Sequence, residues 1–133
     1  MNLTQLAALI DGKHTPLRGC HLSIREAAST AQGKFAPHPF CLVSQWTILD
    51  IEVSSDQLNA LQLRGLEPVV VYALCVVQDS RGRYRPGDWV RTSFQTRYES
   101  SGFFLTKNTM YVLLGDGRRQ LIAIDDLNAL VGK

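Results

Sequence analysis

The sequence predicts an α+β fold with a mainly antiparallel, twisted sheet of about five to six strands. Helix-capping patterns occur in the first third of the chain, apolar runs of strand length dominate after it, and turn-forming residues separate these runs. Such an order of elements is typical of α+β domains. The 133 residues fit one domain (1–133), made of a helical N-terminal part (1–39) and a sheet-rich core (40–133).

Two helices are expected in the N-terminal part. The first covers residues 3–10, where leucines recur at helical spacing. The second begins at a capping box formed by Ser23 and Glu26 and ends at Gly33. Residues 34–39 contain two prolines and predict a linker into the sheet.

The sheet is expected to begin at Phe40. The apolar face of residues 46–53 shifts once, which predicts a β-bulge. Ser54 and Gln57 form a second capping box and predict a short helix between the first two strands. The nearly continuous apolar run 69–77 then fits a central strand that is buried on both faces.

Turn residues divide the second half of the chain into short strands. Residues 81–87 predict a turn, and Lys107-Asn108 and Asp116-Gly117 predict two hairpins. Asp125 is expected to cap a short C-terminal helix. The strands expected between these signals are residues 89–96, 103–106, 110–114 and 120–124.

Positive charge is concentrated in one segment. The whole chain has a net charge of +2, whereas residues 81–119 hold eight basic and three acidic side chains, a local net charge of +5. An excess of this size steers anionic partners but falls short of a strongly basic nucleic-acid-binding domain. The basic residues of the segment are Arg81, Arg83, Arg85, Arg91, Arg97, Lys107, Arg118 and Arg119.

The sequence favours a soluble cytoplasmic protein. No basic region precedes the short apolar run near the N-terminus, so a signal peptide is not indicated. No apolar stretch approaches the length of a membrane span. Three cysteines are an odd number without the spacing of a disulfide framework, which is typical of reduced thiols.

Cysteine and histidine residues of the first third raise metal binding and nucleophilic catalysis as alternatives. They include no paired C-x-x-C or H-x-x-x-H spacing, and they match no known zinc motif. A buried cysteine or two with surface histidines explains them better, so no metal, cofactor or catalytic residue is predicted. A small enzyme remains the least favoured reading. The metal candidates are His14, Cys20, His21, His38 and Cys41, and the enzyme site would be assembled from His14, Cys20, His21 or Asp50.

The segment from Ser80 to Arg97 is the strongest candidate for recognition, because it combines five arginines with three aromatic residues. On the expected strand, Trp89 and Arg91 share an outer face and Val90 and Phe94 face the core. Arginine and tryptophan are enriched in binding hot spots. The opposing reading places Trp89 in the core, with arginines that only solubilise a hairpin. The predicted binding residues are Arg81, Arg83, Arg85, Trp89, Arg91, Arg118 and Arg119.

We therefore expect a binding module that contacts a partner protein through this Arg/Trp hairpin. Nucleic-acid binding by the same arginines is the alternative, and it predicts affinity that falls steeply with salt. Exposed strand edges would also allow a homodimer.

Four segments resemble a known family: residues 68–73 (PVVVYA), 79–83 (DSRGR), 87–93 (GDWVRTS) and 108–115 (NTMYVLLG). They are similar to the pattern of a family of small uncharacterised proteins from pseudomonad-like gammaproteobacteria. The resemblance covers about residues 40–120. It implies a bacterial cytoplasmic protein and supplies no catalytic or binding residues.

Overall fold

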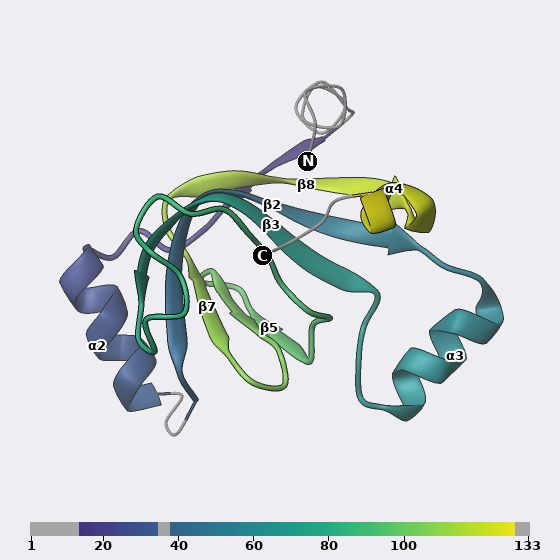
Figure 1. Cartoon of the computed structure of the whole chain (residues 1–133), viewed down its shortest axis with the longest axis horizontal. Coiled ribbons are helices and arrows are strands. Elements are labelled where there is room, and N and C mark those ends of the chain that lie inside the picture. Colours follow the sequence, from purple (N-terminus) through teal and green to yellow (C-terminus); the bar gives the residue numbers. More distant parts are fainter. Residues whose placement is uncertain (1–13, 35–37, 130–133) are drawn as a thin grey trace.

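The sheet is organised around its longest strand, β2 (Phe40–Glu52), in the computed structural model, which describes residues 14–34 and 38–129 (Figure 1). One edge of β2 pairs antiparallel with β3 (Val69–Asp79). The other edge is shared by two strands that both run parallel to it. The first half of β2 pairs with β7 (Met110–Leu113), and the second half pairs with β8 (Asp116–Ala123).

The hairpin predicted at Asp116-Gly117 is wrong, because both residues lie in β8. β7 and β8 follow each other along the same edge of β2 instead of folding back on each other. The chain changes direction between them at Gly115, whose φ of +69° lies in the region that favours glycine. A turn signal is local and cannot distinguish a bend between two collinear strands from a hairpin.

The complete sheet is mixed and has eight strands, so the expectation of five to six mainly antiparallel strands was only partly right. The α+β class and the strand-rich second half are confirmed, as are the expected helices that fall within the described residues. The hairpin around Lys107-Asn108 is also confirmed. The remaining strands all pair antiparallel. β1 (Thr15–Arg18) pairs with β8, and β4 (Val90–Arg91) pairs with β3. β5 (Arg97–Glu99) pairs with β6 (Phe103–Leu105), which also pairs with β7.

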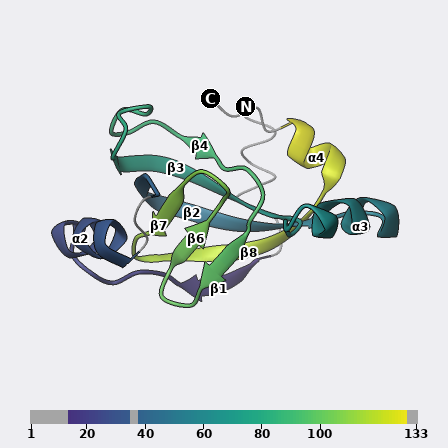
Figure 2. The same cartoon turned by 90° about the horizontal axis from the view of Figure 1, so that it is seen from below.

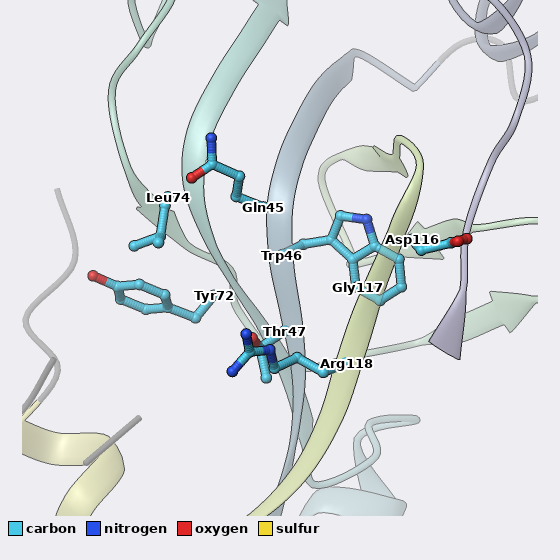
Figure 3. A pocket seen from close by; sticks show the side chains of 8 residues that line it. All are labelled: Gln45, Trp46, Thr47, Tyr72, Leu74, Asp116, Gly117 and Arg118. Atoms are coloured by element: carbon cyan, nitrogen blue, oxygen red, sulfur yellow. The ribbon is translucent and has the colours of Figure 1, made fainter. Parts of the chain in front are cut away.

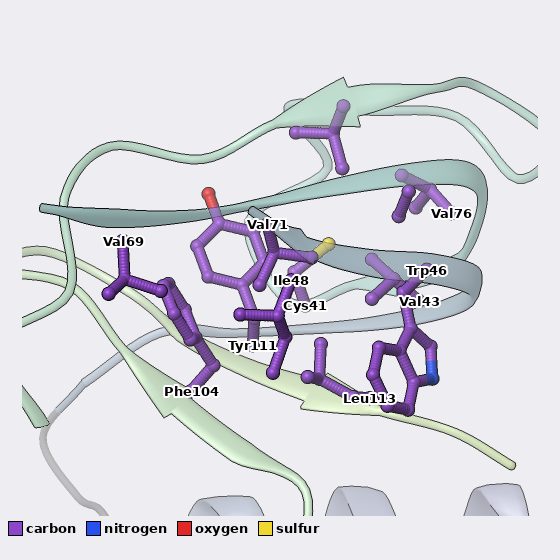
Figure 4. Close-up of a cluster of buried hydrophobic side chains, with 12 residues drawn as sticks. Cys41, Val43, Trp46, Ile48, Val69, Val71, Val76, Phe104, Tyr111 and Leu113 are labelled. Carbon is purple, nitrogen blue, oxygen red and sulfur yellow. The ribbon is translucent and has the colours of Figure 1, made fainter. Parts of the chain in front are cut away.

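The sheet curls until its two ends are joined by the chain between β4 and β5. In this segment the Thr92 and Gln95 amides donate to carbonyl groups of β3, and the Thr96 amide then donates to Leu105 of β6. Figure 2 shows the chain passing from β4 toward β6. A cluster of buried side chains fills the inside of the curl (Figure 4), among them Trp46, Ile48, Val71, Val90, Phe104, Tyr111 and Leu113.

Three described helices lie outside the sheet: α2 (Ile24–Lys34), α3 (Ser55–Leu63) and α4 (Ile124–Ala129). The capping boxes at Ser23 and Ser54 are confirmed, because each serine hydroxyl accepts from the backbone N–H three residues later and that residue's side chain accepts in return. α3 projects away from the sheet (Figure 1), and no residue of α3 is buried.

Two expectations for the ends of the chain change. Part of the segment expected to be helical, Thr15–Arg18, is a strand, because it pairs with β8. Asp125 lies in the first turn of α4 and does not precede it. The helix expected over residues 3–10 falls outside the described residues.

The predicted bulge near Ile48 and Leu49 has a different explanation. Both side chains are fully buried, one inside the curl and one on its outer face, and the pairing with β3 runs without interruption from Trp46 to Asp50. The apparent shift therefore reflects burial on both faces. The irregularities of β2 occur earlier, as a register shift between Leu42 and Val43 and a positive φ at Gln45. Burial of β3 on both faces is confirmed over Val69–Ala73.

Candidate binding site

The seven predicted binding residues do not form one surface. Arg81 and Arg85 are exposed in the turn between β3 and β4. Arg83 lies in the same turn, but its guanidinium is hydrogen-bonded to other side chains of the protein. Its Nη2 lies 3.1 Å from Asp79 Oδ1, and its Nη1 donates to Thr109 Oγ1 at 3.1 Å.

Asp79 anchors this turn. Its side chain is inaccessible to solvent, and it accepts hydrogen bonds from the backbone N–H groups of Arg83 and Tyr84 as well as from the Arg83 guanidinium. Burial raises the pKa of the Asp79 carboxyl, but the hydrogen bonds and the charge of Arg83 outweigh burial and lower this pKa overall. Arg83 therefore has a structural role in the turn.

Arg118 and Arg119 are neighbours on β8 and point to opposite faces of the sheet. Arg119 forms a bidentate ion pair with Asp50, with Nε and Nη2 each 2.7 Å from a carboxylate oxygen. This contact raises the pKa of the guanidinium. It also gives Asp50, named in the enzyme alternative, a structural partner. Arg118 lies on the outer face of the sheet, opposite Thr47 of β2.

A row of four side chains crosses this outer face from strand to strand. The register places Arg91 opposite Tyr72, Tyr72 opposite Thr47, and Thr47 opposite Arg118. Directly paired residues of neighbouring strands project from the same face of a sheet. Two of the predicted arginines, far apart in the sequence, therefore flank a tyrosine and a threonine. Figure 3 shows the Arg118 side chain lying across Thr47 toward Tyr72.

Trp89 belongs to the same face but is neither fully exposed nor in the interior of the curl. It is half-buried, and its ring stacks on Tyr72 with 5.6 Å between ring centroids and 23° between ring planes. Val90 is buried inside the curl as predicted, whereas Phe94 packs on the outer face. The regular alternation fails at Phe94 because β4 ends at Arg91.

The outer face also gathers the buried polar atoms that lack partners. Among the described residues, the fully buried side-chain atoms without a hydrogen bond are Tyr72 Oη, Arg91 Nε and Gln120 Oε1. Gln120 lies opposite Leu49, two residues along β8 from Arg118, and so projects from the same face. Most buried polar atoms in proteins are hydrogen-bonded. The three exceptions therefore gather on one face of the sheet, at positions that solvent does not reach.

A hollow of about 370 Å³ opens beside this row (Figure 3). Gln45 borders it in a left-handed conformation, with φ of +53°, and backbone strain of this kind concentrates at functional sites. Burial raises the pKa of Tyr72, so its hydroxyl stays protonated at neutral pH. The hollow is lined by Gln45, Trp46, Thr47, Tyr72, Leu74, Asp116, Gly117 and Arg118.

Trp46 fixes the start of β8 beside the hollow. Its indole Nε1 donates to the Leu114 carbonyl at 3.0 Å. Gly117 lies directly on the ring, because a Cβ at this position would come within 2.5 Å of Trp46 Cδ2. This close approach positions Arg118, the next residue, on the outer face. The sequence pointed to the arginines but gave no signal for Tyr72, Thr47 or Gln45, whose proximity depends on strand register.

The cysteine and histidine residues are dispersed in the structure. Cys41 is fully buried inside the curl, and burial raises the pKa of its thiol to about 12, which leaves it protonated at neutral pH. His21 Nε2 lies 2.6 Å from Asp116 Oδ1, and this contact lowers the pKa of the carboxyl. Within residues 14–34 and 38–129, no group of three or more His, Cys, Asp or Glu side chains is arranged to hold a metal ion.

Two further hollows meet at Lys34, at the end of α2. They measure about 420 and 520 Å³ and are bordered by several basic side chains. Glu99 lies among them and forms ion pairs with Lys34 at 2.9 Å and with Arg97 at 3.3 Å. The basic residues along the two hollows are Arg18, His21, Lys34, His38, Arg97 and Lys107.

The fold and the site define an α+β domain with a curled mixed sheet and a candidate binding face on the outside of β3, β2 and β8. The chain belongs to a family described as a domain of unknown function (DUF6957), whose model matches residues 18–129. Membership of an uncharacterised family is therefore confirmed, over a longer stretch than the resemblance covered. No curated protein and no solved structure matches the chain. In the described part of the chain, no helix has the length and apolar character needed to span a membrane.

Proposed function

We propose that this protein is a non-enzymatic binding module that recognises a partner protein through the Arg91–Arg118 face, which consists of Arg91, Tyr72, Thr47, Arg118 and the adjoining Trp89. The observation that carries the proposal is the strand register, which brings two partly exposed arginines, Arg91 and Arg118, onto one outer face beside the partly exposed Trp89.

The chemistry of the face supports binding rather than catalysis. Arginine, tyrosine and tryptophan are the residue types enriched in protein-binding hot spots. Trp89 stacks on the buried Tyr72 ring, so the exposed part of the indole presents contact area at a low cost in conformational entropy. The nearby hollow offers a recess for one side chain or end group of a partner.

We further propose a bacterial cytoplasmic setting. It rests on the sequence resemblance and on the free state of Cys20, Cys41 and Cys75. A homodimer through the exposed strand β1 is compatible with this role, because β1 pairs with β8 alone among the described strands.

Nucleic-acid binding is a second candidate, favoured by one observation. The hollows that meet at Lys34 place basic side chains from β1, α2 and β5 along one side of the molecule. This surface differs from the arginines that the sequence suggested, which are Arg81, Arg83, Arg85, Arg91, Arg118 and Arg119. A mobility-shift titration at low salt tests it, and a salt-sensitive complex abolished by Lys107→Ala would favour this candidate over the first.

The proposed function is tested by affinity capture from a bacterial lysate with three forms of the protein. Wild type is compared with Arg91→Ala/Arg118→Ala and with Arg81→Ala/Arg85→Ala, a control that removes two exposed arginines outside the face. We expect a protein captured by wild type and by the control but lost with the first variant. It must then bind directly when purified. Identical sets of captured proteins for all three forms would contradict the proposal.

A further inference from the structure

We infer that the hollow bordered by Lys34, Arg97 and Lys107 binds the phosphate monoester group of a small phosphorylated compound. This hollow measures about 420 Å³ and lies where the end of α2 meets the start of β5 and the turn after β6. Its volume falls in the range of about 300–1,000 Å³ that is typical of small-molecule sites. The hollow shares no lining residue with the Arg91–Arg118 face, so the inference goes beyond the proposed function.

Solvent reaches all three cationic side chains of the hollow. The side chains of Lys34 and Arg97 are 57% and 60% exposed, and Lys107 is exposed in the turn between β6 and β7. Arg97 pairs with Leu105, two residues before Lys107, so the pairing of β5 with β6 brings these two cations together. Among the described residues that line the hollow, none is acidic. An anion from solvent therefore meets only positive or neutral side chains there.

The charged side chains of the hollow offer only hydrogen-bond donors, because neither lysine nor arginine has an acceptor. Two threonine hydroxyls also line it, but their protons are already engaged within the protein. Thr96 Oγ1 donates to the Leu105 carbonyl at 3.1 Å. Thr106 Oγ1 donates to the Thr109 carbonyl at 3.2 Å. The ligand group that fits three converging donors carries several acceptors, and a phosphate monoester presents three terminal oxygens where a carboxylate presents two.

Glu99 already holds two of these cations from outside the hollow. One of its carboxylate oxygens lies 2.9 Å from Lys34 Nζ and the other 3.3 Å from Arg97 Nη2, yet Glu99 does not line the hollow. The hydrogen bond from Lys34 lowers the pKa of the Glu99 carboxyl, so this group is ionised at neutral pH. Glu99 therefore orients Lys34 and Arg97 and at the same time cancels part of their charge.

The charge balance favours a phosphate monoester over a phosphodiester. Lys34, Arg97 and Lys107 with Glu99 sum to a net charge of about +2. A phosphate monoester carries about −1.5 to −2 at pH 7, which matches this sum. Each diester group of a nucleic-acid backbone carries only one negative charge. A small compound with a terminal phosphate is therefore the ligand that neutralises the hollow.

The test is calorimetric titration of the full chain with glycerol phosphate at low salt, at which exposed charges are least screened. We expect Lys107→Gln to weaken binding about fivefold to tenfold, the loss of one charge-assisted contact. Lys107 is exposed, so urea unfolding should show an intact fold. Arg81→Gln, which removes an exposed arginine outside the hollow, should change the affinity by less than about twofold. No binding of glycerol phosphate, or equal binding by Lys107→Gln and wild type, would overturn the inference.

Glu99→Gln tests the electrostatic part of the account with the opposite sign. The amide keeps an acceptor for Lys34 or Arg97 but removes the competing negative charge. Binding of glycerol phosphate should therefore tighten several-fold, because one unit charge at about 4 Å is worth about 1 kcal/mol in water, roughly a fivefold change in affinity. An affinity equal to that of wild type, or lower, would show that the phosphate does not sit beside these two cations.

Three further probes identify the source of the phosphate. Dimethyl phosphate, a diester, should bind at least about fivefold more weakly than glycerol phosphate. A single-stranded oligonucleotide without terminal phosphates that binds more tightly than glycerol phosphate, and loses this binding with Lys107→Gln, would assign the hollow to a nucleic-acid backbone. A phosphoserine peptide that binds far more tightly than glycerol phosphate would assign it to a phosphorylated protein. Either result would overturn the inference of a small ligand.

Discussion

Arg91 of β4 stands directly opposite Tyr72 of β3, and each carries a fully buried polar atom that has no hydrogen-bond partner among the described residues. Two donors left unpaired side by side destabilise the isolated protein. Trp89 stacks on the Tyr72 ring from one side and contributes to its burial.

Replacing Trp89 by alanine should destabilise the protein. The substitution removes the stacked contact with Tyr72, and an aromatic pair contributes about 0.5–1.5 kcal/mol beyond the area it buries. We expect a total loss of about 1–3 kcal/mol in the free energy of unfolding by urea, with Trp89→Phe losing less than half as much. A Trp89→Ala protein as stable as wild type would show that the ring does not pack on Tyr72.

Gly117→Ala should be more damaging than its single methyl group suggests. The added Cβ would meet the Trp46 carbonyl oxygen and ring at 2.5 Å, and both lie in the rigid core. We expect a loss of about 1–3 kcal/mol or more, measured by thermal and urea unfolding. Gly33→Ala is the matched control: its Cβ meets nothing within 4 Å at a helical position, so it should be neutral or stabilising by up to about 1 kcal/mol.

Asp79→Asn should make stability less sensitive to acid. The pKa of Asp79 is lowered in the folded protein from its ordinary value of 3.8, so the carboxylate stabilises the fold above this value. That contribution is lost as pH falls through the folded pKa. At neutral pH we expect the variant to be about 1–3 kcal/mol less stable than wild type.

The measurement is urea unfolding of both proteins across the acid range. The difference between wild type and Asp79→Asn should shrink below about pH 4. A difference that is the same at neutral and acid pH would mean that the Asp79 charge does not hold the turn through Arg83.

The three cysteines should react unequally with iodoacetamide at about pH 8. Cys41 is fully buried and its thiol has a pKa raised to about 12, so it should be protected until the protein unfolds. Cys75 is partly exposed and should be alkylated first. Mass spectrometry of tryptic peptides after short exposure checks the order. Rapid modification of Cys41 in the folded protein would favour the enzyme reading that the sequence left as an alternative.

Local features of this fold could be predicted from the sequence, and non-local ones could not. The capping pairs Ser23/Glu26 and Ser54/Gln57 depend on residues three apart, so their patterns identified both helix starts. The parallel pairing of β2 with two successive strands depends on contacts between distant segments, which no local pattern encodes. A hairpin was therefore predicted where the chain only bends.

In the candidate site, too, local features could be predicted from the sequence and non-local ones could not. Composition singled out Trp89 and Arg91 within one short segment, and Arg118 from a later one. Only the register of four strands brings Arg91 and Arg118 to the same row and separates Arg118 from Arg119. Tyr72 was hidden within an apolar run that correctly predicted a buried strand, because an unpaired hydroxyl leaves no mark in the sequence.

The central claim is that the Arg91–Arg118 face binds the partner, and its most direct test is the dissociation constant of the purified captured protein, measured by calorimetry. Arg91→Gln should weaken binding about tenfold or more, because it removes a charged donor that is buried in the complex. Arg85→Gln should change the constant by less than about twofold, as substitutions outside an interface do. Equal dissociation constants for wild type and Arg91→Gln, with both proteins folded, would contradict the claim.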